Sequence, residues 1–137
     1  MVKKTHVWEG ERLLARTAFE NLEVYKLAER LADSIWRVVR KWDAFARDTV
    51  GKQLVRAADG IGANIAEGVG RGSFQDNRRF VRIGRGSLYE VIHWLRRAYV
   101  RELISRADTG LIKPMITELS PRLNAYLRSI GSKGKNN

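Results

Sequence analysis

Several side chains between residues 73 and 101 have the chemistry to hold an anionic polymer. At about 100° per residue, one side of a helix here carries four arginines, a tyrosine and, at its edge, a histidine: Arg78, Arg82, Arg85, Arg96, Tyr89 and His93. Guanidinium groups bind phosphate through paired hydrogen bonds, and aromatic rings stack on bases. This arginine stripe predicts contact with RNA or DNA. The alternative is that acids of other helices, or a neighbouring subunit, cover it.

The charge balance around the stripe supports an anionic partner. Between residues 71 and 106, nine arginines stand against three carboxylates, whereas an ordinary solvated helix face mixes both signs. The whole chain has 26 basic and 15 acidic residues, a net charge of +11. Such a surplus favours a nucleic acid, or less strongly an anionic membrane surface, as the partner.

The sequence contains no arrangement of residues that is typical of a catalytic site or a metal site. His6 and His93 are the two histidines; His6 lies in the expected arm, and we interpret the lone His93 as a surface side chain and not as a metal ligand. Glu67 lacks a nearby partner for acid–base work, and Ser73 lacks the context of a nucleophile elbow. The Gly-rich turns lack the strand and lysine of a phosphate-binding loop. We therefore expect no enzyme activity, no cofactor and no metal.

Length and composition predict one cytoplasmic domain. A chain of 137 residues with 44% hydrophobic residues can bury a core. There is no cysteine, which excludes disulfides and thiolate metal sites and fits a reducing compartment. No apolar run approaches the ~20 residues that span a bilayer, so we expect no membrane association.

Apolar residues recur at steps of three and four in four segments, which predicts four helices. The segments are 19–42, 50–67, 73–101 and the stretch from Ser105 to about 130. Between the first two, Asp48 or Thr49 is expected to cap the helix that follows. The second helix is expected to end near Gly68, where Gly68, Gly70 and Gly72 supply the backbone freedom that a helix stop and a tight turn require.

The third and fourth helices each have a start signal. Ser73 with Asp76, and Ser105 with Asp108, have the spacing of capping pairs. Pro114 and Pro121 interrupt the last helix, which we expect to be bent or broken.

Short connections between four helices predict an all-α fold, an antiparallel up-down-up-down four-helix bundle. The bundle is expected to span residues 19–130, after a basic N-terminal arm (1–18) and before a disordered C-terminal tail (131–137). Gly60, Gly62 and Gly84 predict close approach of the second and third helices. The apolar face of the third helix is expected at Phe80, Gly84, Ser87, Val91, Leu95 and Ala98. Val81, Leu88 and Ile92 widen that face and suggest an oligomer interface.

A series of short stretches carries a family resemblance. They are FENLEVYKLA (19–28), QLVRAA (53–58), NIAEG (64–68), Arg71 with Ser73, Arg79 with Phe80, and GSL with Glu90 (86–90). In this order they resemble the four-helix-bundle family first met in intervening sequences of bacterial 23S ribosomal RNA genes. The resemblance covers about residues 19–130. Relatives of that family include accessory proteins of diversity-generating retroelements, which form pentameric barrels.

The resemblance implies a bundle that assembles as a homopentamer, has no catalytic activity and associates with nucleic acid, with a reverse transcriptase as a further partner. The alternative function is an oligomeric structural or adaptor protein that binds another protein without touching nucleic acid. The signature residues carried over are Asn64, Glu67, Gly68, Arg71, Ser73, Phe80, Gly86, Ser87 and Glu90. We interpret Glu67 as an ion-pair partner of Arg71 across the turn. The two prolines of the last helix, and a connection (43–49) without proline, depart from the family pattern.

Overall fold

The computed structural model describes residues 19 and 22–132, and this part of the chain contains helices but no strand. The helices are α2 (Glu23–Val39), the single turn α3 (Ala44–Ala46), the π-helical turn η3 (Arg47–Gly51), α4 (Lys52–Val69), α5 (Phe74–Val100) and α6 (Arg106–Ser129). The predicted arm (1–18) and residues 133–137 of the predicted tail lie outside the described residues.

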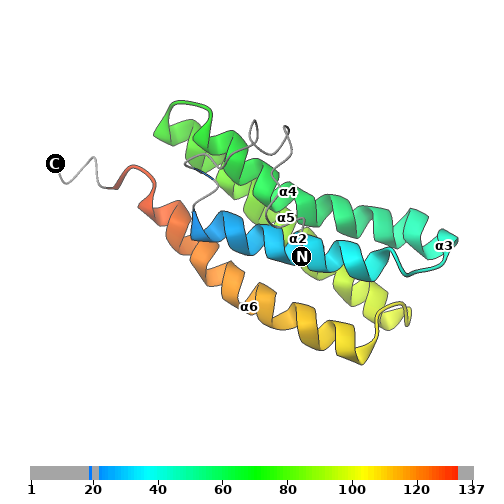
Figure 1. The fold of residues 1–137 in the computed structure, drawn as a ribbon. Coiled ribbons are helices and arrows are strands. Elements are labelled where there is room, and N and C mark those ends of the chain that lie inside the picture. The colour runs from blue at the N-terminus through cyan, green and yellow to red at the C-terminus, as the bar shows by residue number, and fades with distance from the viewer. Residues whose placement is uncertain (1–18, 20–21, 133–137) are drawn as a thin grey trace, which may run out of the picture.

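The four long helices run alternately up and down in a bundle, as predicted (Figure 1). Helix α4 packs most extensively against α5, whereas α5 and α6 touch much less. One core holds the largest buried side chains: Leu31, Ile35, Leu54, Ile61, Ile65, Leu88, Ile112, Leu119 and Leu123. Burying each such side chain stabilises the fold by roughly 1.5–3 kcal/mol. Within the described residues, no helix has both the length and the apolar character needed to cross a membrane.

Helical structure begins earlier than Val50, because Asp43 is a cap that the sequence analysis missed. The amide of Ala46 donates to Asp43 Oδ1 at 3.0 Å, and helical conformation then continues through α3, η3 and α4. The prediction of a connection at 43–49 capped by Asp48 or Thr49 was therefore wrong. Both residues lie inside the π turn, where the Thr49 hydroxyl donates to the Phe45 carbonyl at 2.7 Å.

The predicted caps of the last two helices are confirmed. The amide of Asp76 donates to Ser73 Oγ at 3.1 Å, and the amide of Asp108 donates to Ser105 Oγ at 3.0 Å. These bonds satisfy amides that have no partner within the first helical turn.

Helix α6 is continuous through both of its prolines, so the prediction of a broken helix was wrong. Pro114 and Pro121 are exposed, and so are Gly110 and Thr117, the residues one turn earlier whose carbonyls lose a donor. On the solvent side of a helix, water can bond such carbonyls. The two prolines therefore cost less here than they would in the core.

Gly60 and Gly84 bring α4 and α5 close together, as predicted, whereas Gly62 faces Tyr25 and Ala28 of α2, so for Gly62 the prediction was wrong. A Cβ on Gly60 would lie 3.0 Å from Ser87 Oγ, and one on Gly84 would lie 3.3 Å from Asn64 Cβ. Helix α4 ends at Val69 with Gly70 as its C-cap, close to the predicted end near Gly68. Gly68 itself allows a close contact with α5, because a Cβ at this position would lie 2.5 Å from Asn77 Oδ1 and 3.0 Å from the Asn77 carbonyl oxygen.

Candidate nucleic-acid interface

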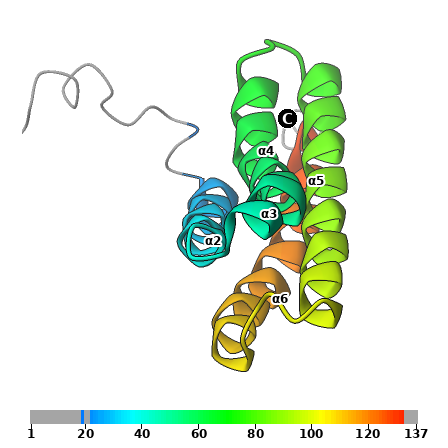
Figure 2. The same ribbon diagram turned by 90° about the vertical axis from the view of Figure 1, so that its right-hand side faces the viewer.

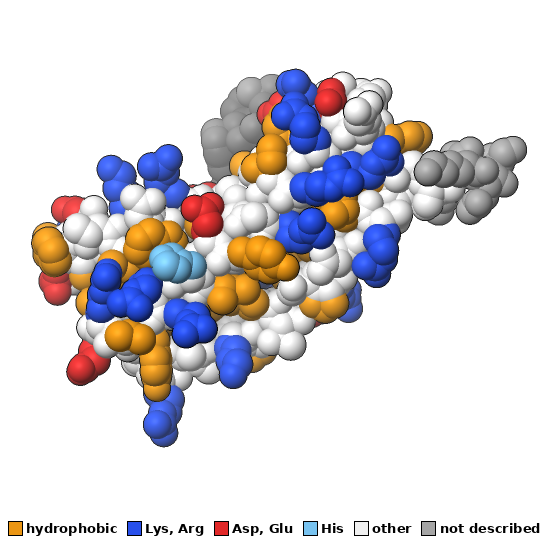
Figure 3. All heavy atoms as spheres, turned by 180° about the vertical axis from the view of Figure 1, so that it is seen from behind, with side chains coloured by type: hydrophobic (Ala, Val, Ile, Leu, Met, Phe, Trp, Pro, Cys, Tyr) orange, Lys and Arg blue, Asp and Glu red, His pale blue; other side chains and the backbone are white. Residues whose placement is uncertain are grey.

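Helix α5 carries the most basic face of the bundle. It contributes six arginines and only two carboxylates, Asp76 and Glu90. Figure 3, which views the molecule from behind, shows Lys and Arg side chains spread over the visible face with hydrophobic side chains between them. Single-stranded nucleic acids bind to surfaces of this kind, because cations contact the phosphates and exposed aromatic rings stack on the bases.

The end of α5 is fixed by two backbone bonds. The amide of Leu103 donates to the Ala98 carbonyl at 2.8 Å, and the amide of Glu102 donates to the Tyr99 carbonyl at 3.0 Å. Glu102 adopts the left-handed conformation, with φ of 60°, that this helix stop requires. Glycine usually occupies that position, so the chain accepts some backbone strain to turn towards α6.

Two arginines of the predicted stripe join α5 to α6. Arg78 Nη1 donates to the Ile130 carbonyl at 2.9 Å, and Arg85 Nη1 donates to Asn124 Oδ1 at 3.1 Å. Both side chains are half-buried, and both partners are neutral. Their charges are therefore not cancelled, although one donor of each is engaged within the protein.

The other members of the stripe face solvent. Arg82, Arg96 and His93 are exposed, and Tyr89 is 59% exposed. Among the described residues, neither Arg82 nor Arg96 forms an ion pair with a carboxylate. His93 makes an edge contact with the Trp94 ring, with the centroids 4.8 Å apart. The available part of the stripe is thus Arg82, Arg96, Tyr89 and His93.

The signature residues at the α4–α5 turn form a small cluster that fixes the turn. Arg71 Nη1 lies 3.2 Å from Glu67 Oε2, which confirms the predicted ion pair. The guanidinium groups of Arg71 and Arg79 lie 5.0 and 4.7 Å from the centroid of the Phe80 ring. Phe80 is therefore half-buried between two cations, and its predicted place on the apolar packing face was wrong.

The remaining signature residues differ in their surroundings. Asn64 Nδ2 donates to the Gly60 carbonyl at 2.7 Å, and Ser87 packs beside Gly60. Gly86 has open space where a Cβ would lie, and Glu90 is exposed. Asn64 and Ser87 thus serve the α4–α5 contact, and no contact within the bundle explains why position 86 is glycine.

The predicted oligomer interface on α5 is only partly available. Val81 and Leu88 are buried inside the bundle, so for these two residues the prediction was wrong. On the predicted packing face, Gly84, Val91 and Ala98 are buried, whereas Ser87 and Leu95 are half-buried. Ile92 and Leu95 line a groove that the sequence analysis missed.

This groove lies between the C-terminal half of α5 and the N-terminal half of α6 and has a volume of about 680 Å³. The α6 residues that line it recur at steps of three and four, and they are Arg106, Thr109, Ile112, Lys113, Ile116 and Thr117. This helical spacing is visible in the sequence. The groove itself cannot be predicted from the spacing, because it depends on how far apart α5 and α6 lie.

The described part of the chain contains no candidate metal site. Its carboxylates and histidine form no group of three or more that could hold a metal ion. Although Asp59 is exposed overall, partial burial of its carboxyl group and the neighbouring carboxylate of Asp33 raise its pKa above the ordinary value of 3.8. Asp59 is exposed on α4, away from the arginine stripe on α5, and we assign it no role in binding.

Comparisons with known proteins agree with this fold. The family model for 23S rRNA-intervening sequence proteins matches residues 20–125. A crystal structure of a protein of unknown function from the S23 ribosomal protein family of Bacteroides thetaiotaomicron VPI-5482 is similar, with a TM-score of 0.68 at 23% identity. The similarity covers 77% of this chain and 99% of that one. A search of curated proteins found no match.

Proposed function

The chain belongs to the family of 23S rRNA-intervening sequence proteins, and we propose that it is a non-enzymatic, oligomeric protein that binds RNA or DNA through α5. The observation that carries this proposal is the exposed pair of arginines Arg82 and Arg96, which have no carboxylate partner among residues 19 and 22–132 and lie on the same helix as the exposed ring of Tyr89. Contacts with phosphates would give affinity without specificity for the nucleotide sequence, and Tyr89 would stack on an unpaired base.

The test is the salt dependence of binding to a labelled single-stranded RNA, measured by fluorescence anisotropy. The structure narrows the choice of variants, because Arg78 and Arg85 also hold α6 and their loss would disturb the bundle. Arg82→Gln removes an exposed cation from the stripe. Arg56→Gln, on the exposed surface of α4, removes the same charge elsewhere and is the matched control.

Arg82→Gln should weaken binding and make the slope of log K against log salt concentration shallower by about 0.7, the change expected for one phosphate on a single strand. Tyr89→Ala should cost about 1–3 kcal/mol on a single strand and less on a duplex, where bases are already stacked. Equal slopes for Arg82→Gln and Arg56→Gln would refute the site.

The oligomer and its partners belong to the same proposal. Five subunits, as the resemblance implies, would repeat the exposed arginines around a ring and multiply the phosphate contacts. A reverse transcriptase partner stays a prediction from the resemblance. The apolar groove between α5 and α6 favours a second function, that of an adaptor that binds protein, and co-purification resistant to nuclease would distinguish it.

A further inference from the structure

The groove between α5 and α6 results from the way in which these helices diverge. Arg78 and Arg85 hold the C-terminal end of α6 against the first half of α5. Towards the other end the helices separate, as Figure 2 shows for the yellow part of α6. Ile104 and Ile112 are buried beneath the groove, and its sides include the half-buried Ile116. The groove therefore has an apolar floor.

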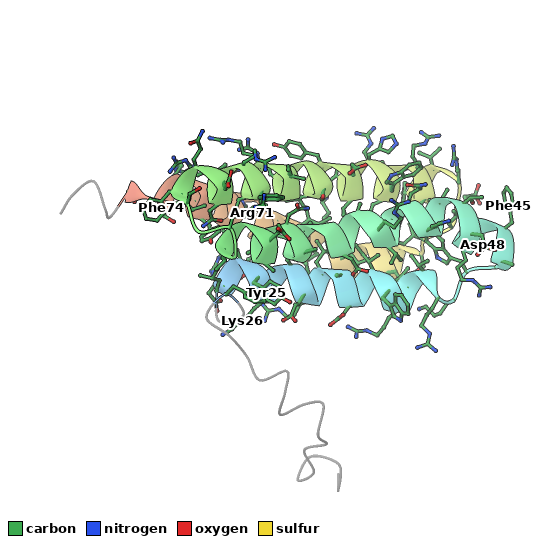
Figure 4. The ribbon with its side chains drawn as sticks, turned by 90° about the horizontal axis from the view of Figure 1, so that it is seen from above. Tyr25, Lys26, Phe45, Asp48, Arg71 and Phe74 are labelled. Atoms are coloured by element: carbon green, nitrogen blue, oxygen red, sulfur yellow. The ribbon has the colours of Figure 1, made fainter. Side chains whose placement is uncertain are left out.

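The arginine stripe leads into this groove. Arg96 belongs to both, because it is a member of the stripe and lines the groove. At about 100° per residue, Arg78, Arg85 and Arg96 lie within about 20° of one another around α5, and the first two reach α6 from that side. Arg71 and Phe74 mark the end of the bundle at which α5 begins (Figure 4). From this end the stripe runs along the side of α5 that faces α6 and reaches the groove.

The charges around the groove suit a polyanion. Its lining includes three exposed cations, one on α5 and two on α6, and no carboxylate; the cations are Arg96, Arg106 and Lys113. Between residues 92 and 117, five cations stand against two carboxylates, and one of these, Asp108, lies 3.7 Å from Lys41. The two threonines of the lining donate to carbonyls one turn earlier in the chain. Positive charge therefore lies on both sides of the apolar floor, and an anionic chain complements it.

The groove also offers surfaces for bases. The ring of Tyr99 lines it and is 58% exposed. Arg96 lies one helical turn before Tyr99, so the two side chains are neighbours on α5. Bases stack on tyrosine rings and on the planes of guanidinium groups. The volume of about 680 Å³ lies within the range of about 300–1,000 Å³ that is typical of ligand sites.

We propose that the groove receives bases of an unpaired segment of RNA or DNA, with one base against Tyr99 and the phosphates at the cations of both sides. This inference rests on the proposed function. It extends the binding site from α5 onto α6 and names an unpaired strand as the substrate, because a duplex keeps its base faces inside the stack. A partner helix with acidic edges is the alternative occupant. The continuity of stripe and groove favours the nucleic acid, since one strand contacts both.

The test measures fluorescence anisotropy of full-length protein with three labelled probes. They are an oligouridylate, an abasic strand of the same length that keeps every phosphate, and an RNA duplex. Lys113→Gln removes a cation from the α6 side, and Tyr99→Ala removes the ring. Lys52→Gln, exposed on α4, and Trp36→Ala, 56% exposed on α2, are the matched controls. Circular dichroism checks that all variants fold.

The two variants should have different effects. Lys113→Gln should weaken binding of the oligouridylate and of the abasic strand alike, and it should make the slope of log K against log salt concentration shallower by about 0.7. Tyr99→Ala should weaken binding of the oligouridylate by roughly 5- to 150-fold, the value of one stacked base, and leave the abasic strand and the duplex unchanged. Lys52→Gln and Trp36→Ala should bind all three probes as the wild type does.

The inference is overturned if Lys113→Gln keeps the wild-type slope, or if Tyr99→Ala has the same effect on strands with and without bases. Arg82→Gln separates this failure from failure of the proposed function. If Arg82→Gln weakens binding while both groove variants bind as the wild type does, the site on α5 stands and the groove is left to a protein partner. If all three variants bind as the wild type does, the proposed function fails as well.

Discussion

The close approach of α4 and α5 at Gly68 makes a prediction about stability that can be worked from distances. A Cβ at this position would lie 2.5 Å from Asn77 Oδ1, 3.0 Å from the Asn77 carbonyl oxygen and 3.3 Å from Asn77 Cα. The side-chain oxygen could rotate away, but the two backbone atoms move only if α5 moves. Gly68→Ala should therefore push the helices apart by a few tenths of an ångström.

Gly86→Ala supplies the reference for this effect, because a Cβ at position 86 would have no neighbour within 4 Å. Replacing glycine by alanine inside a helix gains about 1 kcal/mol in both variants. Overpacking costs about 1–3 kcal/mol and applies only to Gly68→Ala. We expect Gly86→Ala to be more stable than the wild type and Gly68→Ala to be less stable than Gly86→Ala by the whole overpacking cost.

The assay is urea unfolding followed by circular dichroism at 222 nm, with the slope m checked to be the same for all variants. The double variant Gly68→Ala with Asn77→Ala separates the two sources of the clash, because it removes the Asn77 amide oxygen and keeps the backbone contacts. If the clash is with the backbone, the double variant recovers little. Equal stability of Gly68→Ala and Gly86→Ala would show that Gly68 is not needed for the close approach of the two helices.

Two further predictions concern single residues. Asp59→Asn should be more stable than the wild type at pH 7, and the difference in stability should shrink as the pH falls towards 3.8. The reason is that partial burial and Asp33 raise the folded-state pKa of Asp59, so the stabilising contribution of its protonated form is lost as the pH rises through that pKa. Urea unfolding at several pH values measures the difference, and a difference that does not change with pH would contradict the prediction. Glu102→Gly should raise stability by about 1 kcal/mol, because glycine adopts the left-handed conformation without strain. Glu102→Ala, which removes the carboxylate but keeps the strain, should show no such gain in the same urea unfolding assay.

The order and number of the long helices could be predicted from sequence because their signals are local. Apolar spacing located α2, α4, α5 and α6, and the caps at Ser73 and Ser105 were correct. The start at Asp43 was missed because α3 is a single turn with too few residues to show a period. The π turn that follows cannot be seen in a pattern that assumes 3.6 residues per turn.

The candidate site was harder to predict because it depends on neighbours. A projection of α5 places Arg78 and Arg85 with Arg82 and Arg96, but it cannot show that α6 and the residue after it supply acceptors to only the first two. Phe80 was misplaced for a related reason. An aromatic ring suits an apolar face, yet it also attracts guanidinium groups, and the arginines at 71 and 79 arrive from two different elements.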